Sequence, residues 1–258
     1  MTENSPKLTA VRDGRVLRVT LTNPERLNAI DYATMARLGD VFTEAAGDPA
    51  VRAIVITGEG KAFCTGADLS ATAGGVTPEE VMDCAGRLVT AIAETPVPVI
   101  ARVNGPAAGV GVGIALAADL VYAAESAYFL LSFTNIGLMP DGGTTALIAA
   151  AAGRALANEM ALLGERLPAA AARDAGLVNA VLASAELDTK VEEAAAKLAH
   201  GPRRALELTK QALNATSLAP LGAALAREKA GQVELLGSPD FIEGATAMLQ
   251  KRKAVFAE

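Results

Sequence analysis

Tryptophan is absent from the 258-residue chain, and all aromatic residues together make up 3% of it, whereas 51% of the residues are hydrophobic. A core must therefore be built from Ala, Val, Leu and Ile, and the chain is long enough to bury a sizeable one. An excess of positive charge is also missing, because the formal net charge is -6. We therefore expect no nucleic-acid partner, although a local basic patch would still allow an anionic substrate.

Cysteine and histidine are nearly missing as well. Cys64 and Cys84 are too few for a disulfide framework and form no CxxC pair, so we expect a reducing, cytoplasmic location. The one histidine, His200, ends a helical pattern just before a Gly-Pro pair, where a cationic side chain favours the helix C-terminus. Without a second histidine the chain has no Ser-His-Asp or Cys-His catalytic set, and we expect no metal site.

The sequence shows no obvious membrane or signal segment. The longest run of small apolar residues, Ala107–Ala118, is rich in glycine and too short to span a bilayer. The N-terminal residues, MTENSPKLTAVRDGRV, lack the apolar centre of a signal peptide. We therefore expect a protein without a membrane partner.

Strand and helix patterns alternate in the first part of the chain, which predicts the α/β class. Runs typical of strands lie at 15–21, 52–57, 97–103, 120–123, 128–131 and 177–182. Apolar residues at helical spacing lie at 35–45 and 81–92. From about residue 144 the pattern is almost wholly helical, in segments at 144–152, 155–163, 169–175, 186–200, 203–216, 220–236 and 239–253. The last helices carry charged residues such as Glu228 on one side and apolar residues on the other. Such helices pack either on their own domain or on a neighbouring subunit, and the sequence leaves both possibilities open.

A glycine-rich segment, NGPAAGVGVGIALAADL at 104–120, follows an expected strand and opens a helix. The dinucleotide fingerprint lacks its third glycine in either register, and no Gly-Lys-Ser/Thr of a phosphate loop follows. Free N–H groups at a helix start near Gly109 would favour a negative oxygen. Alternatively, the glycines only let the helix pack closely on a neighbour. On this segment alone, close packing is at least as well supported as an anion-binding site.

A second glycine-bearing turn, GKAFCTGADL at 60–69, follows the strand expected at 52–57. Two such turns, each ending a strand, can bring two backbone N–H donors to one oxygen, as in an oxyanion hole. We interpret Cys64 in this turn as a packed small hydrophobic residue, because no neighbouring base or cation in the sequence would lower its pKa.

Together with further motifs, these turns resemble the enoyl-CoA hydratase/isomerase (crotonase) superfamily. The matching segments are NPERLNAI at 23–30, RAIVITGEGKAFCTGADL at 52–69, PVPVIARVNGPAAGVGVGIALAADLVYAAESAYF at 96–129, IGLMPDGGTT at 136–145, GERLPAAAARDAGLVNAV at 164–181 and KRKAVF at 251–256. The resemblance implies a superhelix (spiral) of ββα turns with an acyl-CoA site over residues 1–200. It also implies a helical oligomerisation region over 201–258 that forms a homotrimer or hexamer. No cofactor is implied, since coenzyme A is part of the substrate.

The resemblance also assigns site residues. Ala67 and Val110 match the two residues whose N–H groups hold the thioester oxygen; position 110 is usually glycine, so the branched side chain should narrow the acyl pocket. The substrate-binding and CoA-binding positions implied are Leu27, Ala29, Ala67, Asp68, Leu69, Gly109, Val110 and Phe133.

The acids that hydration needs are missing at the expected places. Hydratases of the family use two glutamates to add water across the double bond, and the matching positions here are Gly113 and Phe133. Asp141 remains. Its local sequence, Pro-Asp-Gly-Gly, favours a turn or a helix cap. The resemblance instead favours a catalytic base, since some isomerases and a dehalogenating member carry an essential aspartate here, and apolar neighbours would raise its pKa.

These observations predict an enoyl-CoA isomerase in which Asp141 moves one proton while two N–H groups hold the enolate oxygen. A dienoyl-CoA isomerase is one alternative, although those relatives use an additional acid where Phe133 stands. A hydratase-like enzyme, a thioester hydrolase and a non-catalytic acyl-CoA-binding protein are the others.

Overall fold

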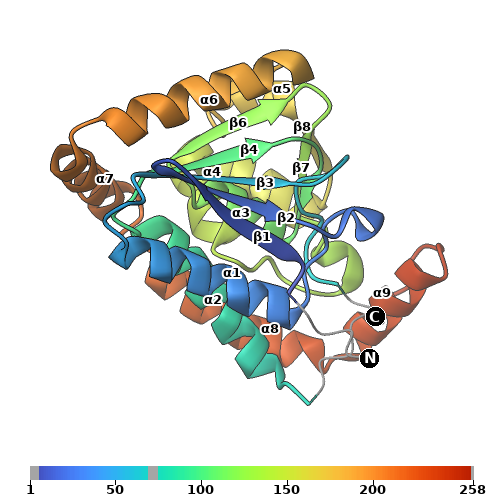
Figure 1. Ribbon diagram of the computed structural model, residues 1–258. Coiled ribbons are helices and arrows are strands. Elements are labelled where there is room, and N and C mark those ends of the chain that lie inside the picture. The colour runs from blue at the N-terminus through green and yellow to red at the C-terminus, as the bar shows by residue number, and fades with distance from the viewer. Residues whose placement is uncertain (1–5, 69–74, 257–258) are drawn as a thin grey trace.

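A six-stranded sheet forms the centre of the computed structural model, which describes residues 6–68 and 75–256 (Figure 1). Its first two strands are antiparallel and all the other neighbours are parallel. The strand order is β1 (Leu8–Asp13), β2 (Val16–Leu21), β3 (Ala53–Gly58), β4 (Val99–Val103), β6 (Leu120–Ala124) and β9 (Ala180–Leu182). Five of these strands lie where the sequence predicts them. β1 was not predicted, because this edge strand is exposed over nearly its whole length and carries no apolar alternation.

A second, three-stranded sheet joins the glycine-rich segment to the rest of the molecule. β5 (Ala107–Ala108) pairs in parallel with β7 (Tyr128–Leu130), which pairs antiparallel with β8 (Arg166–Pro168). Strands of two or three residues are too short to show a period, so only β7 was predicted. The short sheet fixes the chain just before residue 110.

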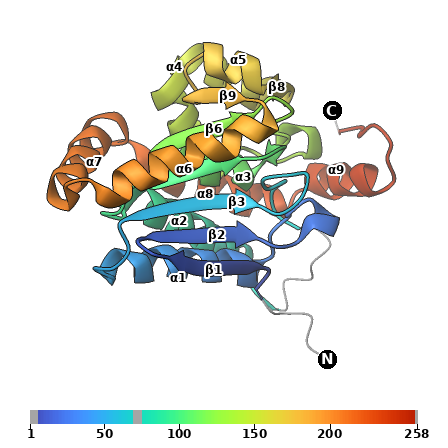
Figure 2. The ribbon, with the colours of Figure 1, turned by 45° about the horizontal axis from the view of Figure 1, so that its top comes forward.

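Helices cover both faces of the large sheet. α1 (Tyr32–Gly47), α2 (Pro78–Glu94) and α8 (Leu221–Leu236) stack side by side on one face (Figure 1). α6 (Ser184–His200) crosses the opposite face (Figure 2) and packs Leu187, Val191 and Ala195 against strand residues such as Val55 and Ile100. Burial on both faces explains why the central strands read as continuous apolar runs.

Polar residues stabilise one end of each of two of these helices. Thr77 and Glu80 form a capping box at the start of α2, where each side chain bonds the backbone N–H of the other residue. His200 is the last residue of α6, and its ring Nδ1 lies 2.8 Å from the carbonyl oxygen of Ala196. The expected position of His200 at a helix C-terminus is therefore confirmed.

The remaining helices follow the sequence closely. They are α3 (Val110–Leu116), α4 (Thr144–Leu163), α5 (Ala169–Asp174), α7 (Arg203–Ser217) and α9 (Pro239–Leu249), with 3₁₀ turns η1 (Pro24–Arg26) and η2 (Thr134–Ile136). Among the described residues, α4 alone is long and apolar enough to cross a membrane by length and composition, which was not predicted. Gly153 breaks it with φ 82° and ψ 167°, and each half is far shorter than a bilayer-spanning helix.

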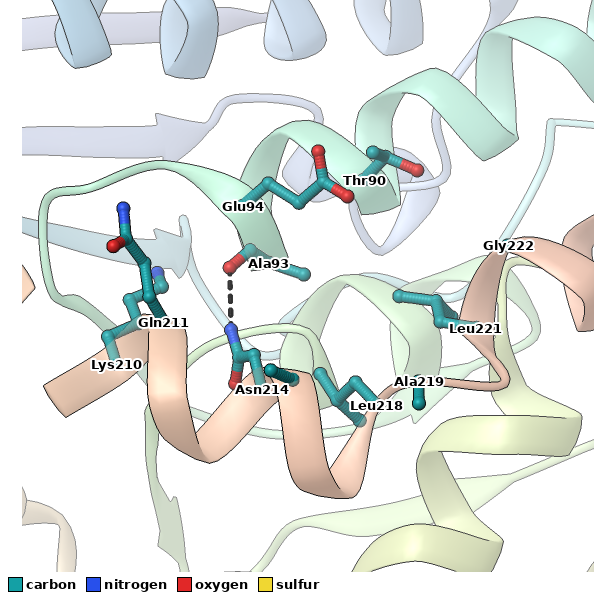
Figure 3. A pocket seen from close by; sticks show the side chains of 11 residues that line it. Thr90, Ala93, Glu94, Lys210, Gln211, Asn214, Leu218, Ala219, Leu221 and Gly222 are labelled. Carbon is teal, nitrogen blue, oxygen red and sulfur yellow. Dashed lines mark hydrogen bonds between the residues drawn. The ribbon is translucent and has the colours of Figure 1, made fainter. Parts of the chain in front are cut away.

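α7 is attached to the C-terminal end of α2 beside a cavity of about 600 Å³ (Figure 3). Asn214 Nδ2 donates to the carbonyl oxygen of Ala93 at 2.8 Å, and Lys210 Nζ donates to that of Ile92 at 3.2 Å. These carbonyls belong to the last turn of α2, where no helical partner is available. Lys210 also contacts Asp119 Oδ2 at 2.8 Å, so the polar groups here have a structural role.

Candidate active site

The two glycine-bearing turns lie against each other. Cys64 and Ala107 form an isolated parallel bridge, and Ala108 N donates to the carbonyl oxygen of Cys64 at 2.9 Å. Gly66 (φ 99°) has left-handed backbone geometry, and a Cβ on it would lie 3.2 Å from the carbonyl oxygen of Ala108. The close approach of the two backbones therefore requires glycine at this point.

Each turn presents one unbonded backbone N–H group. Ile30 N donates to Gly66 O and Ile30 O accepts from Asp68 N, so the N–H of Ala67 between them is left over. Val110 is the first residue of α3, where an N–H has no helical acceptor. In the described parts of the chain neither N–H has a protein acceptor, and both residues line a cavity of about 410 Å³. This is the arrangement expected of an oxyanion hole.

Two asparagines support this arrangement and were not predicted. Asn28 is fully buried, and its amide donates to the carbonyl oxygens of Glu59 and Ala62 at 2.9 and 2.8 Å. Asn104 donates to the carbonyl oxygen of Ala62 as well, at 3.0 Å. Both side chains therefore hold the start of the glycine-bearing turn at 60–69, although one precedes this turn in the sequence and the other follows it. Both lie within the segments that carry the family resemblance, at 23–30 and 96–129, and nothing else in the sequence marks them.

Most of the site residues expected from the sequence meet at this cavity. Those that line it are Ala29, Ala67, Asp68, Gly109, Val110, Phe133 and Asp141. Leu27 does not line it: its φ of 52° turns the residue outward, its side chain is exposed, and its carbonyl oxygen accepts from Thr65 Oγ1. Leu69 lies outside the described residues.

The remaining wall of the cavity comes from the C-terminal helices. Gln232 and Leu236 of α8 and Met248 and Leu249 of α9 face the same space. The region over 201–258, expected to serve oligomerisation, therefore also completes the site. Most of the lining is apolar, and its apolar side chains include Met35, Met82, Val81 and Ile136.

Cys64 is adjacent to the oxyanion turn but is fully buried. Burial raises the pKa of its thiol to about 12, so the thiol stays protonated near neutral pH. The sequence interpretation of Cys64 as a packed hydrophobic residue agrees with this environment.

Asp141 lines the cavity from the turn that precedes α4. Burial raises the pKa of its carboxyl group to about 7; a hydrogen bond from Gln232 lowers this pKa, and the negative charge of Glu228 raises it. Gln232 Nε2 donates to Asp141 Oδ2 at 2.7 Å. A carboxyl group with a pKa near 7 can both accept and return a proton at neutral pH.

The turn that carries Asp141 is fixed by Glu228, which is 1% exposed. Its Oε2 accepts from Gly143 N at 2.7 Å, and its Oε1 accepts from Thr145 N at 3.1 Å and from Thr145 Oγ1 at 2.5 Å. Glu228 belongs to the charged side of its helix, but this residue faces the protein interior and not solvent. The carboxylate is buried because three donors at the start of α4 satisfy it.

Gly113 of α3 lies directly against the same turn. A Cβ at this position would overlap the carbonyl oxygen of Gly142. Any side chain at 113 is therefore incompatible with the present path of the chain between Asp141 and Gly143.

Comparison with known proteins agrees with this geometry. Residues 12–258 match the family model described as enoyl-CoA hydratase/isomerase. The chain belongs to this family. The crotonase-type fold predicted from the sequence is thereby confirmed, because the chain aligns with a crystal structure of an enoyl-CoA hydratase from Mycobacterium avium subsp. paratuberculosis K-10 with a TM-score of 0.92. The two chains are 47% identical, and the alignment covers 98% of this chain and 99% of the other.

The names of relatives within the enoyl-CoA hydratase/isomerase family cover more than one reaction. A probable enoyl-CoA hydratase of Rhodobacter capsulatus is 42% identical over 92% of this chain and 93% of its own length. A 1,2-epoxyphenylacetyl-CoA isomerase of Escherichia coli K12 is 37% identical over 93% of this chain and 94% of its own length. Family membership therefore implies an acyl-CoA thioester as substrate, while the reaction depends on the groups at the site.

Proposed function

We propose that this enzyme moves a double bond within an enoyl-CoA thioester, with Asp141 as the proton shuttle. One observation carries the proposal. Of the described residues that line the cavity, Arg26, Asp68 and Asp141 have titratable side chains, and Arg26 Nη2 binds Asp68 Oδ1 at 2.9 Å. Of these three side chains, Asp141 is the one outside this ion pair, and its pKa is about 7.

In the proposed reaction, the Asp141 carboxylate takes a proton from C2 of a 3-enoyl thioester. The electrons move into the thioester carbonyl, and the resulting negative oxygen accepts hydrogen bonds from the N–H groups of Ala67 and Val110. The protonated Asp141 then returns the proton to C4, which leaves the double bond between C2 and C3. Loss of one oxyanion donor in other enzymes costs roughly two to three orders of magnitude in rate.

Hydration is disfavoured by the same set of groups. Addition of water needs one group to deprotonate the water and another to protonate Cα. The family resemblance assigns these roles in hydratases to positions that are Gly113 and Phe133 here. Gly113 has no room for a side chain, and Phe133 presents an apolar ring to the cavity. A single acid–base group, Asp141, supports isomerisation instead.

The test of this assignment is the variant Asp141→Asn, incubated with a 3-enoyl-CoA while conjugation is followed in the ultraviolet. We expect turnover to fall by at least about 10²-fold, within the usual range for a positioned acid–base group. The matched control is Asp174→Asn, because Asp174 is an exposed carboxylate on α5, and this variant should keep full activity. Unchanged turnover in Asp141→Asn contradicts the proposal. A wild-type protein that binds acyl-CoA but exchanges no α-protons in heavy water would instead be a non-catalytic binder.

We also propose that the protein is cytoplasmic and forms a homotrimer or a hexamer of paired trimers. The proposed assembly is supported by large apolar side chains that are exposed on α4 and α9. Leu162 is 69% exposed, Leu163 57%, Ile242 64% and Leu249 71%. Large apolar side chains with this much exposure favour contact with another chain.

A further inference from the structure

Two polar side chains of α8, Glu228 and Gln232, point away from solvent although both are expensive to bury. They are one helical turn apart and are 1% and 2% exposed. Both reach the turn that carries Asp141 and the start of α4. Burial of a carboxylate and an amide is tolerated only when their polar atoms have partners. Here all the hydrogen-bond partners lie in the segment from Met139 to Thr145.

The amide of Gln232 is held at both ends. Its Oε1 accepts from Met139 N at 3.3 Å, and its Nε2 donates to Asp141 Oδ2 at 2.7 Å. Because the backbone N–H of Met139 can only donate, it fixes which end of the amide is the oxygen. The NH₂ group is thereby directed at the Asp141 carboxylate, and the amide cannot rotate without losing both bonds.

This contact distinguishes the two oxygens of Asp141. No other side chain or backbone donor in the described residues bonds the Asp141 carboxylate, so Oδ2 is occupied and Oδ1 is available. We propose that Gln232 is a positioning residue of the reaction, which holds Oδ2 so that Oδ1 exchanges the proton with the acyl-CoA. The inference rests on the proposed function, in which Asp141 is the base.

The hydrogen bond from Gln232 matters for the protonation of Asp141 because of the charged and titratable groups around this carboxyl group. α3 carries no titratable side chain, and α2 and α9 face the cavity with apolar residues. Arg26 and Asp68, which also line the cavity, bind each other. Glu228 is the charged group that acts on Asp141, and it raises the pKa of the carboxyl group. The donor of Gln232 opposes that effect because it favours the charged form. Loss of the donor should therefore shift the proton equilibrium of Asp141 to higher pH.

The experiment compares kcat and KM across pH for wild type, Gln232→Met and Gln232→Glu, with a 3-enoyl-CoA as substrate. Met keeps the size of the side chain without a donor. Glu keeps an acceptor for Met139 N and replaces the donor with a like charge, so it serves if Gln232→Met does not fold. We expect both variants to move the midpoint of the pH profile upward, by about one pH unit for Met. At neutral pH this shift should lower kcat about fivefold, with KM within about twofold. The matched control is Gln211→Met on the exposed side of α7, which should leave the profile unchanged.

The outcomes separate the two proposals. An unchanged midpoint and kcat in a folded Gln232 variant, together with an inactive Asp141→Asn, overturn the positioning role and leave the proposed function intact. A loss of activity that follows only a loss of thermal stability, with the midpoint unchanged, also overturns it, because a structural residue would behave this way. Full activity in Asp141→Asn overturns both.

Discussion

Asp141 titrates near neutral pH because apolar surroundings and Glu228 disfavour its charge. Its ordinary pKa is 3.8, so at pH 5 the free side chain is ionised while this one is mostly protonated. A base works only when it is ionised. The reactivity of the site therefore depends on pH in a range where most carboxyl groups are already fully ionised.

The first prediction concerns this dependence. For wild type, kcat/KM with a 3-enoyl-CoA should rise with pH and level off above a midpoint of about 7, since the ionised form of Asp141 abstracts the proton. The measurement is the initial rate of conjugation at low substrate concentration between about pH 5 and pH 9. A profile that is flat over this range, or that has its midpoint near pH 4, would contradict the role of Asp141.

The second prediction concerns Gly113. Gly113→Ala should lower kcat by at least about tenfold, because its Cβ overlaps Gly142 O and forces the turn with Asp141 to move. Gly113→Glu should likewise lose isomerase activity and gain no hydratase activity. Gly222→Ala on α8 is the control, since its Cβ meets nothing within 4 Å. A Gly113→Glu enzyme that hydrates a 2-enoyl-CoA while keeping its isomerase activity would show that the two arrangements are compatible.

Single residues of the site were predictable to different degrees. Ala67, Val110 and Asp141 lie in short motifs whose order matches the family, and the cavity brings them together. Gln232 was not predictable, because its partner Asp141 is 91 positions away and nothing in the local pattern of α8 marks it. The burial of Glu228 was not predictable either, because a charged residue on a helix is usually exposed.

At the scale of elements, α7 and α2 are joined mainly by polar contacts. Lys210 is 7% exposed and connects the last turn of α2, Val97 before β4, and Asp119 before β6. Burial lowers the pKa of Lys210, while the contact with Asp119 acts in the opposite direction. The pair is therefore a junction of three elements rather than a catalytic pair.

The third prediction follows from this junction. Lys210→Met should reduce the free energy of unfolding by about 3 kcal/mol, because the Asp119 carboxylate and two carbonyl groups lose their donor. The pH profile of activity should not change. Chemical denaturation of this variant and of Lys197→Met, an exposed lysine on α6, measures the difference. Equal stability of the two variants would contradict the structural role of Lys210.

Helices and strands were predictable where burial imposes a regular spacing of apolar residues along the sequence. The long helices and the central strands were found in this way, and even the break of α4 at Gly153 separates the two helical segments expected there. The short strands β5 and β8 were not found, because they are defined by pairing with β7 and not by their own residues.

At the scale of the whole molecule, the C-terminal helices have two roles in this account. α8 and α9 close the cavity, and the exposed residues of α9 and α4 are proposed to contact other subunits. Sequence alone left open whether these helices pack on their own domain or on a neighbour. α8 packs on α2 of its own chain.

The fourth prediction is the mass in solution. Light scattering after gel filtration should give three or six times the chain mass of 26.2 kDa. The double variant Leu162→Arg and Leu163→Arg should lower this mass, because it places charges on the exposed apolar surface of α4. A wild-type protein that elutes as a monomer would contradict the proposed assembly.

The most direct test of the central claim is the identity of the product that wild-type enzyme forms from a panel of enoyl-CoA thioesters. Mass spectrometry and NMR distinguish a shifted double bond, which leaves the mass unchanged, from hydration, which adds one water. We predict that 3-enoyl-CoA is converted to 2-enoyl-CoA, and that this conversion is lost in Asp141→Asn. A 3-hydroxyacyl-CoA as the main product, or conversion that persists in Asp141→Asn, would contradict the account.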